Sequence, residues 1–128
     1  MDLVTPELRE QLIANGRNPD SDRVPVVKWF NPAGAGTWLI VDADPADPDM
    51  HFGLADLGLG TPELGKVSLR ELQYFEGPFG LGIERDLWFE GRWPISVYAE
   101  AARQAGRIVE FGPELDAAAR GRTEPAEA

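Results

Sequence analysis

The stretch Val24–Leu59, VPVVKWFNPAGAGTWLIVDADPADPDMHFGLADLGL, decides the fold. It contains three runs rich in β-branched and aromatic residues, at 24–30, 37–43 and 51–59. A loop with proline and glycine separates the first run from the second, and a loop of aspartate and proline separates the second from the third. Runs of this composition joined by short loops typically pair as antiparallel neighbours. We therefore expect a three-stranded meander.

Three segments outside this stretch carry helix signals. Thr5-Pro6-Glu7 predicts a helix start, because threonine caps well and proline is preset for the first turn, and Asn15-Gly16 predicts its end. Ser68-Leu69-Arg70-Glu71 matches a capping box, which predicts a helix of about two turns. Pro94–Ala105 is rich in alanine, has one apolar face and is followed by Gly106, which predicts a third helix.

Two more segments have strand character, Leu81–Phe89 by its alternation and Ile108–Phe111 as a candidate edge strand. Together these elements predict an α+β fold, a mainly antiparallel sheet of about four to five short strands with about three packed helices. The order of the strands stays open. We expect one domain over residues 1–112 and, because apolar residues become scarce from Pro113, a mobile or weakly helical tail over 113–128.

The negative charge of the chain is concentrated in one interval. The formal net charge is −10, and the 37 residues between Lys28 and Lys66 contain no lysine or arginine. A one-sided field of this kind favours cationic partners and repels nucleic acid. The acids of the interval are Asp42, Asp44, Asp47, Asp49, Asp56 and Glu63.

Few residues are available for covalent catalysis. The chain has no cysteine, which excludes disulfides and thiolate chemistry, and His51 is its only histidine. Ser68 and Ser96 stand at predicted helix starts, where capping is the common role, so a hydrolase triad is not expected. We expect His51 to be a structural residue at the start of a strand, and we expect no cofactor.

The aspartates of the 44–49 loop allow a metal hypothesis. Asp42, Asp44, Asp47 and Asp49 could supply oxygen ligands for Ca²⁺ or Mg²⁺, but the loop lacks the glycine and the distal glutamate of an EF-hand. A solvated hairpin loop is the favoured interpretation. A metal-dependent enzyme that uses these carboxylates, or Glu84 and Asp86, is the alternative function.

The alternation of side chains between the two faces of a strand also predicts an ion pair. Arg85 shares a strand face with Ile83 and Leu87, and Asp56 shares one with Phe52 and Leu54. A charge in an apolar row needs a partner, because burying it alone costs several kcal/mol. We therefore expect Asp56 and Arg85 to form a structural pair, and a ligand-binding role for Arg85 is the alternative.

Aromatic residues add a possible recognition surface. Four tryptophans could form one, and Trp88 shares its strand face with Glu84 and Asp86. For most of the four, packing in the core is the expected role. The tryptophans are Trp29, Trp38, Trp88 and Trp93.

Five motifs are specific in their order and spacing. They are Lys28-Trp29-Phe30-Asn31-Pro32, Thr37-Trp38-Leu39-Ile40, Phe52–Gly58, Pro62–Leu69 and Glu84-Arg85-Asp86. Together they resemble a family of bacterial proteins with a domain of unknown function, often encoded on plasmids and integrative conjugative elements. The resemblance covers roughly Leu3 to Glu110 and implies a single compact domain with an accessory role in a mobile element. The family lends no catalytic or binding residue.

The favoured function is a non-enzymatic interaction module in the cytoplasm. Its acidic hairpin surface would bind a basic partner protein, with phosphate mimicry as one form of that idea. Direct binding of nucleic acid or membranes is not expected, and the oligomeric state stays open. The proposed binding residues are Asp42, Asp44, Asp47, Asp49, Glu84 and Asp86.

Overall fold

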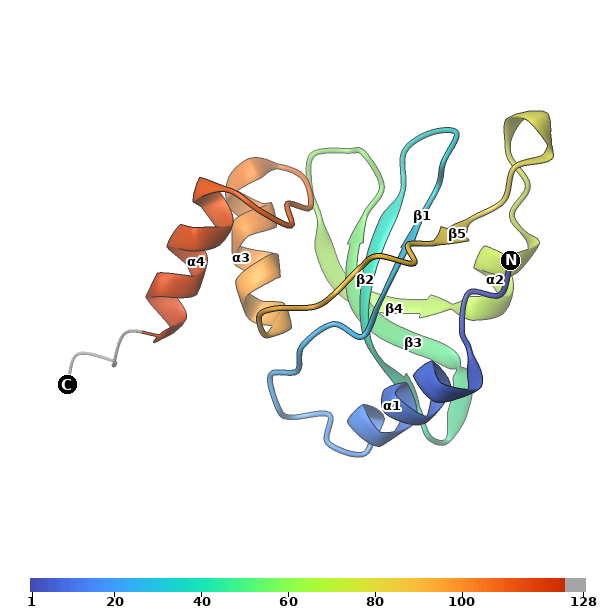
Figure 1. Cartoon of the computed structure of the whole chain (residues 1–128), viewed down its shortest axis with the longest axis horizontal. Helices are drawn as coiled ribbons and strands as arrows, with labels where there is room; N and C mark the ends of the chain where they lie inside the picture. The colour runs from blue at the N-terminus through green and yellow to red at the C-terminus, as the bar shows by residue number, and fades with distance from the viewer. Residues whose placement is uncertain (124–128) are drawn as a thin grey trace.

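A computed structural model of the chain describes residues 1–123. Its centre is one antiparallel sheet of five strands in the order β4-β3-β2-β1-β5 (Figure 1). The meander predicted from Val24–Leu59 is present as β1, β2 and β3, and the α+β fold is confirmed. The strands are β1 Val27–Phe30, β2 Thr37–Asp44, β3 Asp47–Asp56, β4 Glu63–Ser68 and β5 Glu84–Arg85.

The three helices predicted from the sequence begin at the predicted signals. The Thr5 hydroxyl accepts a hydrogen bond from the Leu8 N–H at 3.2 Å, and the Ser68 hydroxyl accepts one from the Glu71 N–H at 3.2 Å. Gly106 ends the third helix with φ of 75°, a left-handed conformation that suits glycine. The helices are α1 Pro6–Gly16, α2 Leu69–Tyr74, the short 3₁₀ turn η1 Pro78–Gly80, α3 Ile95–Ala105 and α4 Pro113–Thr123.

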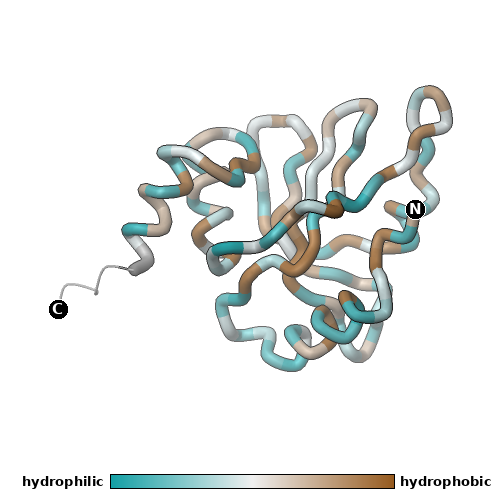
Figure 2. The backbone as a smooth tube through the Cα atoms, in the orientation of Figure 1, coloured by the Kyte–Doolittle hydropathy of each residue, from teal (hydrophilic) through white to brown (hydrophobic). Residues whose placement is uncertain are grey.

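Helices cover both faces of the sheet, so β2 is buried on both sides. Leu39 and Val41 of β2 pack with α3 and α4, whereas Trp38 and Ile40 pack with α1 and α2. Figure 2 shows the hydrophobic residues concentrated where the strands cross in the middle of the molecule. This explains the unbroken run of apolar residues in β2, since a strand covered on both faces has no polar side.

The backbones of β2 and β3 approach closely at Gly53. A Cβ atom at this position would lie 2.0 Å from the Leu39 carbonyl oxygen, so only glycine fits. The pairing is irregular between Ile40 and Asp42 and between Ala43 and Asp44, and it closes with Asp44 opposite Asp47. The acidic loop is therefore a tight turn, and β3 begins at Asp47 rather than at the predicted His51.

Two predicted strands differ in the structure. β5 spans only Glu84–Arg85: the Asp86 N–H still donates to the Lys28 carbonyl of β1 at 3.0 Å, and the chain then turns, with the Phe89 N–H donating to the Asp86 carbonyl at 3.3 Å. The candidate edge strand at 108–111 is not a strand. Its Ile108 N–H is bound by the Asp56 carboxylate at 3.0 Å instead of by a neighbouring strand.

Up to residue 123, the segment expected to be a mobile or weakly helical tail is helical and packs on the domain. Pro113–Thr123 forms α4, and Leu115, 2% exposed, and Ala119 are buried against the core that includes α3. One leucine and small alanines are enough for α4 to pack closely, because the facing surface of α3 is itself lined with Ala101 and Ala102. The rest of the predicted tail, residues 124–128, lies outside the described residues. No helix within residues 1–123 is long and apolar enough to cross a membrane.

Candidate functional site

The acidic hairpin is largely engaged in holding the fold together. Asp42 is only 7% exposed, and its Oδ2 lies 2.5 Å from Nη1 of Arg23. The same nitrogen donates to the Asn15 carbonyl at 2.7 Å, so Arg23 joins the end of α1 to β2. Asp42 therefore has a structural role and exposes little of its side chain.

Asp49 likewise has a structural role. Its Oδ2 accepts a hydrogen bond from the Ser68 hydroxyl at 2.5 Å, and its Oδ1 accepts one from the Arg70 N–H at 2.8 Å. These two hydrogen bonds lower the pKa of the Asp49 carboxyl. Asp49 therefore fixes the start of α2 against β3.

The remaining hairpin acids are Asp44 and Asp47. Asp44 Oδ1 accepts a hydrogen bond from the Ala46 N–H at 2.8 Å within the turn, and Asp47 is the one of the four aspartates that is exposed. Among the described residues, no three histidine, aspartate or glutamate side chains are grouped so that they could hold a metal ion. Nothing in this geometry favours the metal-dependent enzyme.

The predicted Asp56–Arg85 pair is wrong. Arg85 lies on β5 and Asp56 on β3, and both β1 and β2 lie between these strands. Asp56 binds the Gly58 and Ile108 N–H groups at 2.9 and 3.0 Å, and Arg85 Nε donates to the Asp2 carbonyl at 3.1 Å. Each of the two side chains is therefore bound by backbone groups close to it. The alternation of side chains along a strand could not have shown this.

His51 is a core residue, and Ser96 lies in the first turn of α3 without capping it, since Asp22 is the residue that binds the helix start. The His51 ring is buried with Nδ1 3.0 Å from the Asp49 carbonyl oxygen, and it meets the Trp29 ring edge-on at 5.3 Å. Burial lowers the pKa of His51. The Ser96 N–H and hydroxyl both donate to the Asp22 carboxylate at the start of α3.

The other two proposed binding residues, Glu84 and Asp86, lie at the edge of the sheet. Glu84 is half-buried opposite Phe30 of β1. Asp86 Oδ2 lies 3.4 Å from Lys28 Nζ, which also contacts Glu110 Oε2 at 2.7 Å. Burial alone would lower the pKa of Lys28, but the hydrogen bond and charge of Glu110, with those of Asp86, raise it above its usual value.

Asp86 also begins the loop that carries the exposed tryptophan. Asp86 Oδ1 accepts a hydrogen bond from the Trp88 N–H at 2.9 Å, and the Trp88 side chain is 92% exposed. Phe111, 71% exposed, lines the same hollow of about 450 Å³. We call its lining the Trp88 surface: Asp86, Trp88, Phe89, Glu90, Arg92, Tyr98, Glu110 and Phe111.

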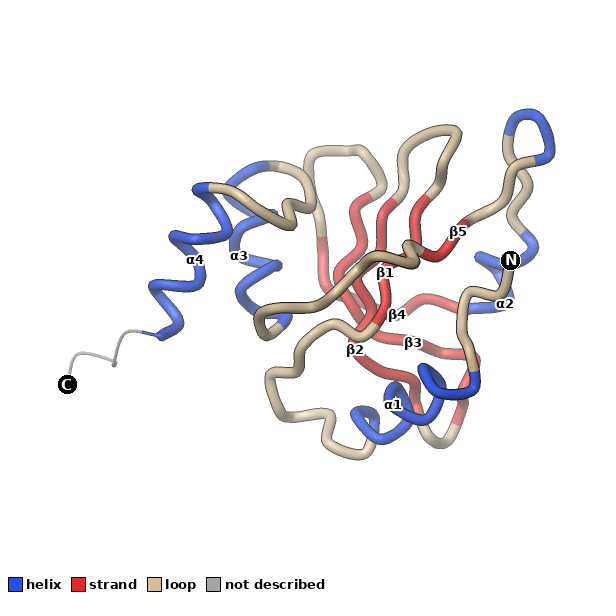
Figure 3. The backbone as a smooth tube through the Cα atoms, viewed as in Figure 1, coloured by secondary structure: helices blue, strands red, loops and turns tan. Residues whose placement is uncertain are grey.

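The Trp88 loop, between β5 and α3, passes across the molecule without regular structure (Figure 3) but is fixed at both ends. At its start, the Asp86 N–H donates to the Lys28 carbonyl at 3.0 Å, and near its end the Arg92 N–H donates to the Tyr98 hydroxyl at 3.0 Å. At Gly91 a Cβ atom would lie 2.2 Å from the Pro25 carbonyl oxygen, so the loop is pressed against the domain. Trp88 is thus exposed on an ordered backbone.

Sequence reasoning found part of this surface and missed the rest. It named Trp88 and Asp86 together, but it placed them on a regular strand and did not include Glu90, Arg92, Glu110 or Phe111. The available signal was Gly91-Arg92-Trp93-Pro94, a turn-forming sequence directly after the aromatic residues. The approach of residues 110–111 depends on the tertiary fold.

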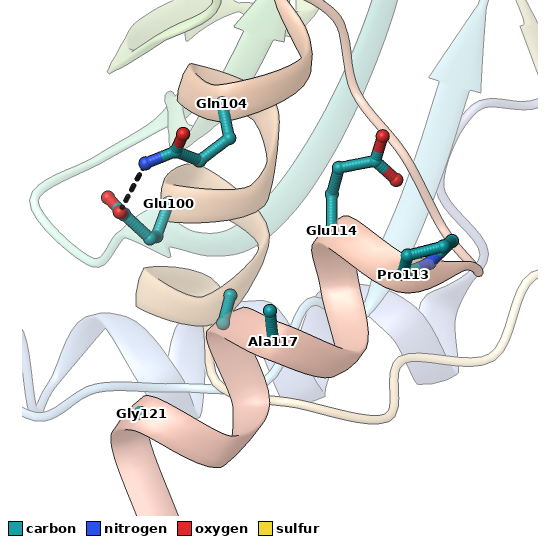
Figure 4. A pocket seen from close by; sticks show the side chains of 7 residues that line it. Glu100, Gln104, Pro113, Glu114, Ala117 and Gly121 are labelled. Carbon is teal, nitrogen blue, oxygen red and sulfur yellow. Dashed lines mark hydrogen bonds between the residues drawn. The ribbon is translucent and has the colours of Figure 1, made fainter.

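Two other surface features are less specific. The groove between α3 and α4 measures about 530 Å³ and is lined mainly by proline, alanine and glycine, with Glu100 bound by the Gln104 amide at 3.2 Å (Figure 4). The loop around η1 projects from the domain (Figure 1), with Phe79 97% exposed at φ of 61°. Neither brings an aromatic side chain together with several charged ones in a hollow, as the Trp88 surface does.

Comparison with known proteins gives one result. The model of a family described as a protein of unknown function (DUF2958) matches residues 3–109. No curated protein and no solved structure is found to match the chain. The matched region includes the whole sheet, α1, α2 and α3, whereas α4 lies beyond it.

Proposed function

The chain belongs to the DUF2958 family of proteins of unknown function, and we propose that it is a non-enzymatic interaction module that binds a basic partner protein through the Trp88 surface. The observation that carries the proposal is Trp88, 92% exposed on a loop that is fixed at both ends. A rigid aromatic side chain loses little conformational freedom on binding, and tryptophan is enriched among the residues that dominate interfaces.

The charges around Trp88 favour a cationic partner. Asp86, Glu90 and Glu110 line the hollow, against one cation, Arg92. Lys28 pairs with Asp86 and Glu110, which leaves Glu90 as the exposed carboxylate for a partner to meet. The net charge of −10 would also accelerate encounter with a basic protein.

This proposal moves the contact away from the acidic hairpin. Asp42 and Asp49 are engaged in the fold, so Asp44 and Asp47 are the hairpin acids left to meet a partner. Phosphate mimicry, which needs a dense row of free carboxylates, loses support for the same reason.

The test compares three surfaces of the same folded chain by titrating each variant with a panel of basic peptides. Trp88→Ala changes the proposed site, Asp44→Asn with Asp47→Asn changes the hairpin, and Phe79→Ala is the matched control for an exposed aromatic side chain. We expect Trp88→Ala to lose most of the binding and the other variants to lose little. Binding should weaken as salt rises, because it depends on charge.

Circular dichroism of each variant establishes that the fold is intact. Equal binding by Trp88→Ala and by the wild-type protein would overturn the proposed site. Greater loss in the hairpin variant than in Trp88→Ala would return the contact to the acidic hairpin.

An accessory role in a mobile genetic element is a further part of the proposal. It is supported by the resemblance of the sequence motifs and places the protein and its partner in the cytoplasm. Deleting the gene should change the transfer frequency of the element, and Trp88→Ala should reproduce the change. Unaltered transfer in the deletion strain would argue against this role.

A further inference from the structure

Arg92 places a cation on an aromatic ring within the Trp88 surface. Its guanidinium carbon lies 5.9 Å from the centroid of the Phe111 ring, a distance typical of a cation–π interaction. The Arg92 N–H is held by the Tyr98 hydroxyl, whereas its side chain is exposed. The free protein therefore already has an arginine side chain in its own binding hollow.

Arg92 is held less firmly than the neighbouring cation, Lys28. Lys28 Nζ lies 5.7 Å from the Phe30 ring centroid and also makes ion pairs with Asp86 and Glu110. The structure records no ion pair for Arg92 with any residue in the described part of the chain, although Glu90 and Glu110 line the same hollow. An exposed cation held by one aromatic face is easily displaced.

Resting on the function proposed above, we propose that the Trp88 surface recognises an arginine side chain of the partner, and that Arg92 is a built-in competitor for the same position. The surface offers a guanidinium two kinds of contact. Phe111 and Trp88, which line the same hollow, offer aromatic faces for the planar group, and the Glu90 carboxylate can accept hydrogen bonds from its edge. Lysine meets these needs less well, because its ammonium is not planar and is more strongly hydrated.

The test uses two short peptides of equal charge, one with two arginines and one with two lysines, titrated into the full chain and followed by the Trp88 indole N–H resonance in NMR. Trp88→Phe assigns that resonance. Arg92→Gln removes the competitor and keeps the backbone N–H that Tyr98 binds. Arg17→Gln, at the end of α1, removes one positive charge elsewhere and is the matched control.

We expect Arg92→Gln to tighten binding of the arginine peptide by about two- to fivefold, the range that corresponds to an exposed cation–π contact. Arg17→Gln should change the affinity for the arginine peptide by less than about half of that factor, since a remote charge acts only through the screened field. The wild-type protein should bind the arginine peptide more tightly than the lysine peptide.

If Arg92→Gln and Arg17→Gln tighten binding of the arginine peptide equally, or if Arg92→Gln weakens it, Arg92 is not a competitor. Equal affinity for the two peptides would overturn arginine recognition. In each of these cases, loss of binding in Trp88→Ala, followed by titration calorimetry because this variant lacks the indole, would still support the interaction module. If no basic peptide perturbs the Trp88 resonance in any variant, the proposed function fails together with this inference.

Discussion

Lys28 and Glu110 lie 82 residues apart in the sequence, and Lys28 Nζ donates a hydrogen bond to Glu110 Oε2 at 2.7 Å. Lys28 belongs to β1, and Glu110 to the segment that joins α3 to α4. The contact therefore fastens the segment that carries Phe111 to the sheet. Lys28 also contacts Asp86, so the same side chain positions both ends of the Trp88 surface.

Because both side chains are mostly buried, we expect the Lys28–Glu110 pair to contribute to stability. A double-mutant cycle with Lys28→Met and Glu110→Gln should give a coupling energy of about 1 kcal/mol in urea unfolding. The exposed Arg103–Glu100 pair on α3 is the control, and its coupling should lie within experimental error. Equal coupling in the two pairs would contradict a role for burial.

The packing of Leu115 predicts that α4 stabilises the domain. Leu115→Ala should lower the free energy of unfolding by about 2 to 3 kcal/mol, since it removes a buried side chain from the surface against α3. Ala117→Ser, at an exposed position of the same helix, should change it by less than about 0.5 kcal/mol. This expectation differs from the one drawn from sequence, a mobile or weakly helical tail from Pro113. An unchanged urea midpoint for Leu115→Ala would show that α4 is not docked in solution.

The burial of His51 predicts that the protein loses stability in mild acid. Its pKa in the folded protein is below the usual 6.5, because burial disfavours the charged ring. The unfolded chain therefore binds a proton at this residue before the folded chain does, and stability falls as the pH drops below 6.5, by at most about 1.4 kcal/mol per pH unit. Above this pH the residue has no effect on the slope.

Urea unfolding between pH 7 and pH 5 measures this slope, and His51→Gln is the control because glutamine does not titrate. The variant should show a flatter pH dependence in this range, whatever its absolute stability. The carboxyl groups with lowered pKa, Asp49 and Glu100, affect stability mainly below about pH 5, where the unfolded chain binds protons at their usual values of 3.8 and 4.5, and both proteins contain them. The same slope in both proteins would contradict the assignment to His51.

The extent to which sequence predicts this structure depends on how local each feature is. The caps at Thr5, Ser68 and Gly106 are set by neighbouring residues, and all three were placed correctly. The Asp56–Arg85 pair failed because strand parity gives the face of a side chain but not the order of the strands. The sheet order, with β1 inserted between β2 and β5, is a tertiary property.

The candidate site was predicted in part for the same reason. The turn that carries Trp88 follows from a local feature, since the Asp86 carboxylate binds the Trp88 N–H two residues away. Phe111 and Glu110 join the site only because α3 returns the chain to the sheet edge. For the acidic hairpin, composition predicted the negative charge correctly. It could not show that Asp42 is mostly buried in an ion pair with Arg23.

The Arg23–Asp42 pair predicts that the hairpin aspartates are not equivalent. Asp42→Asn should lower the free energy of unfolding by about 3 kcal/mol, because it leaves the mostly buried Arg23 guanidinium without its counter-ion. Asp47→Asn, at an exposed position of the same hairpin, should change it by less than about 0.5 kcal/mol. Chemical denaturation of the two variants beside the wild-type protein measures the difference. Equal, small effects would mean that Asp42 is free to meet a partner, and the acidic hairpin would again compete with the Trp88 surface as the binding site.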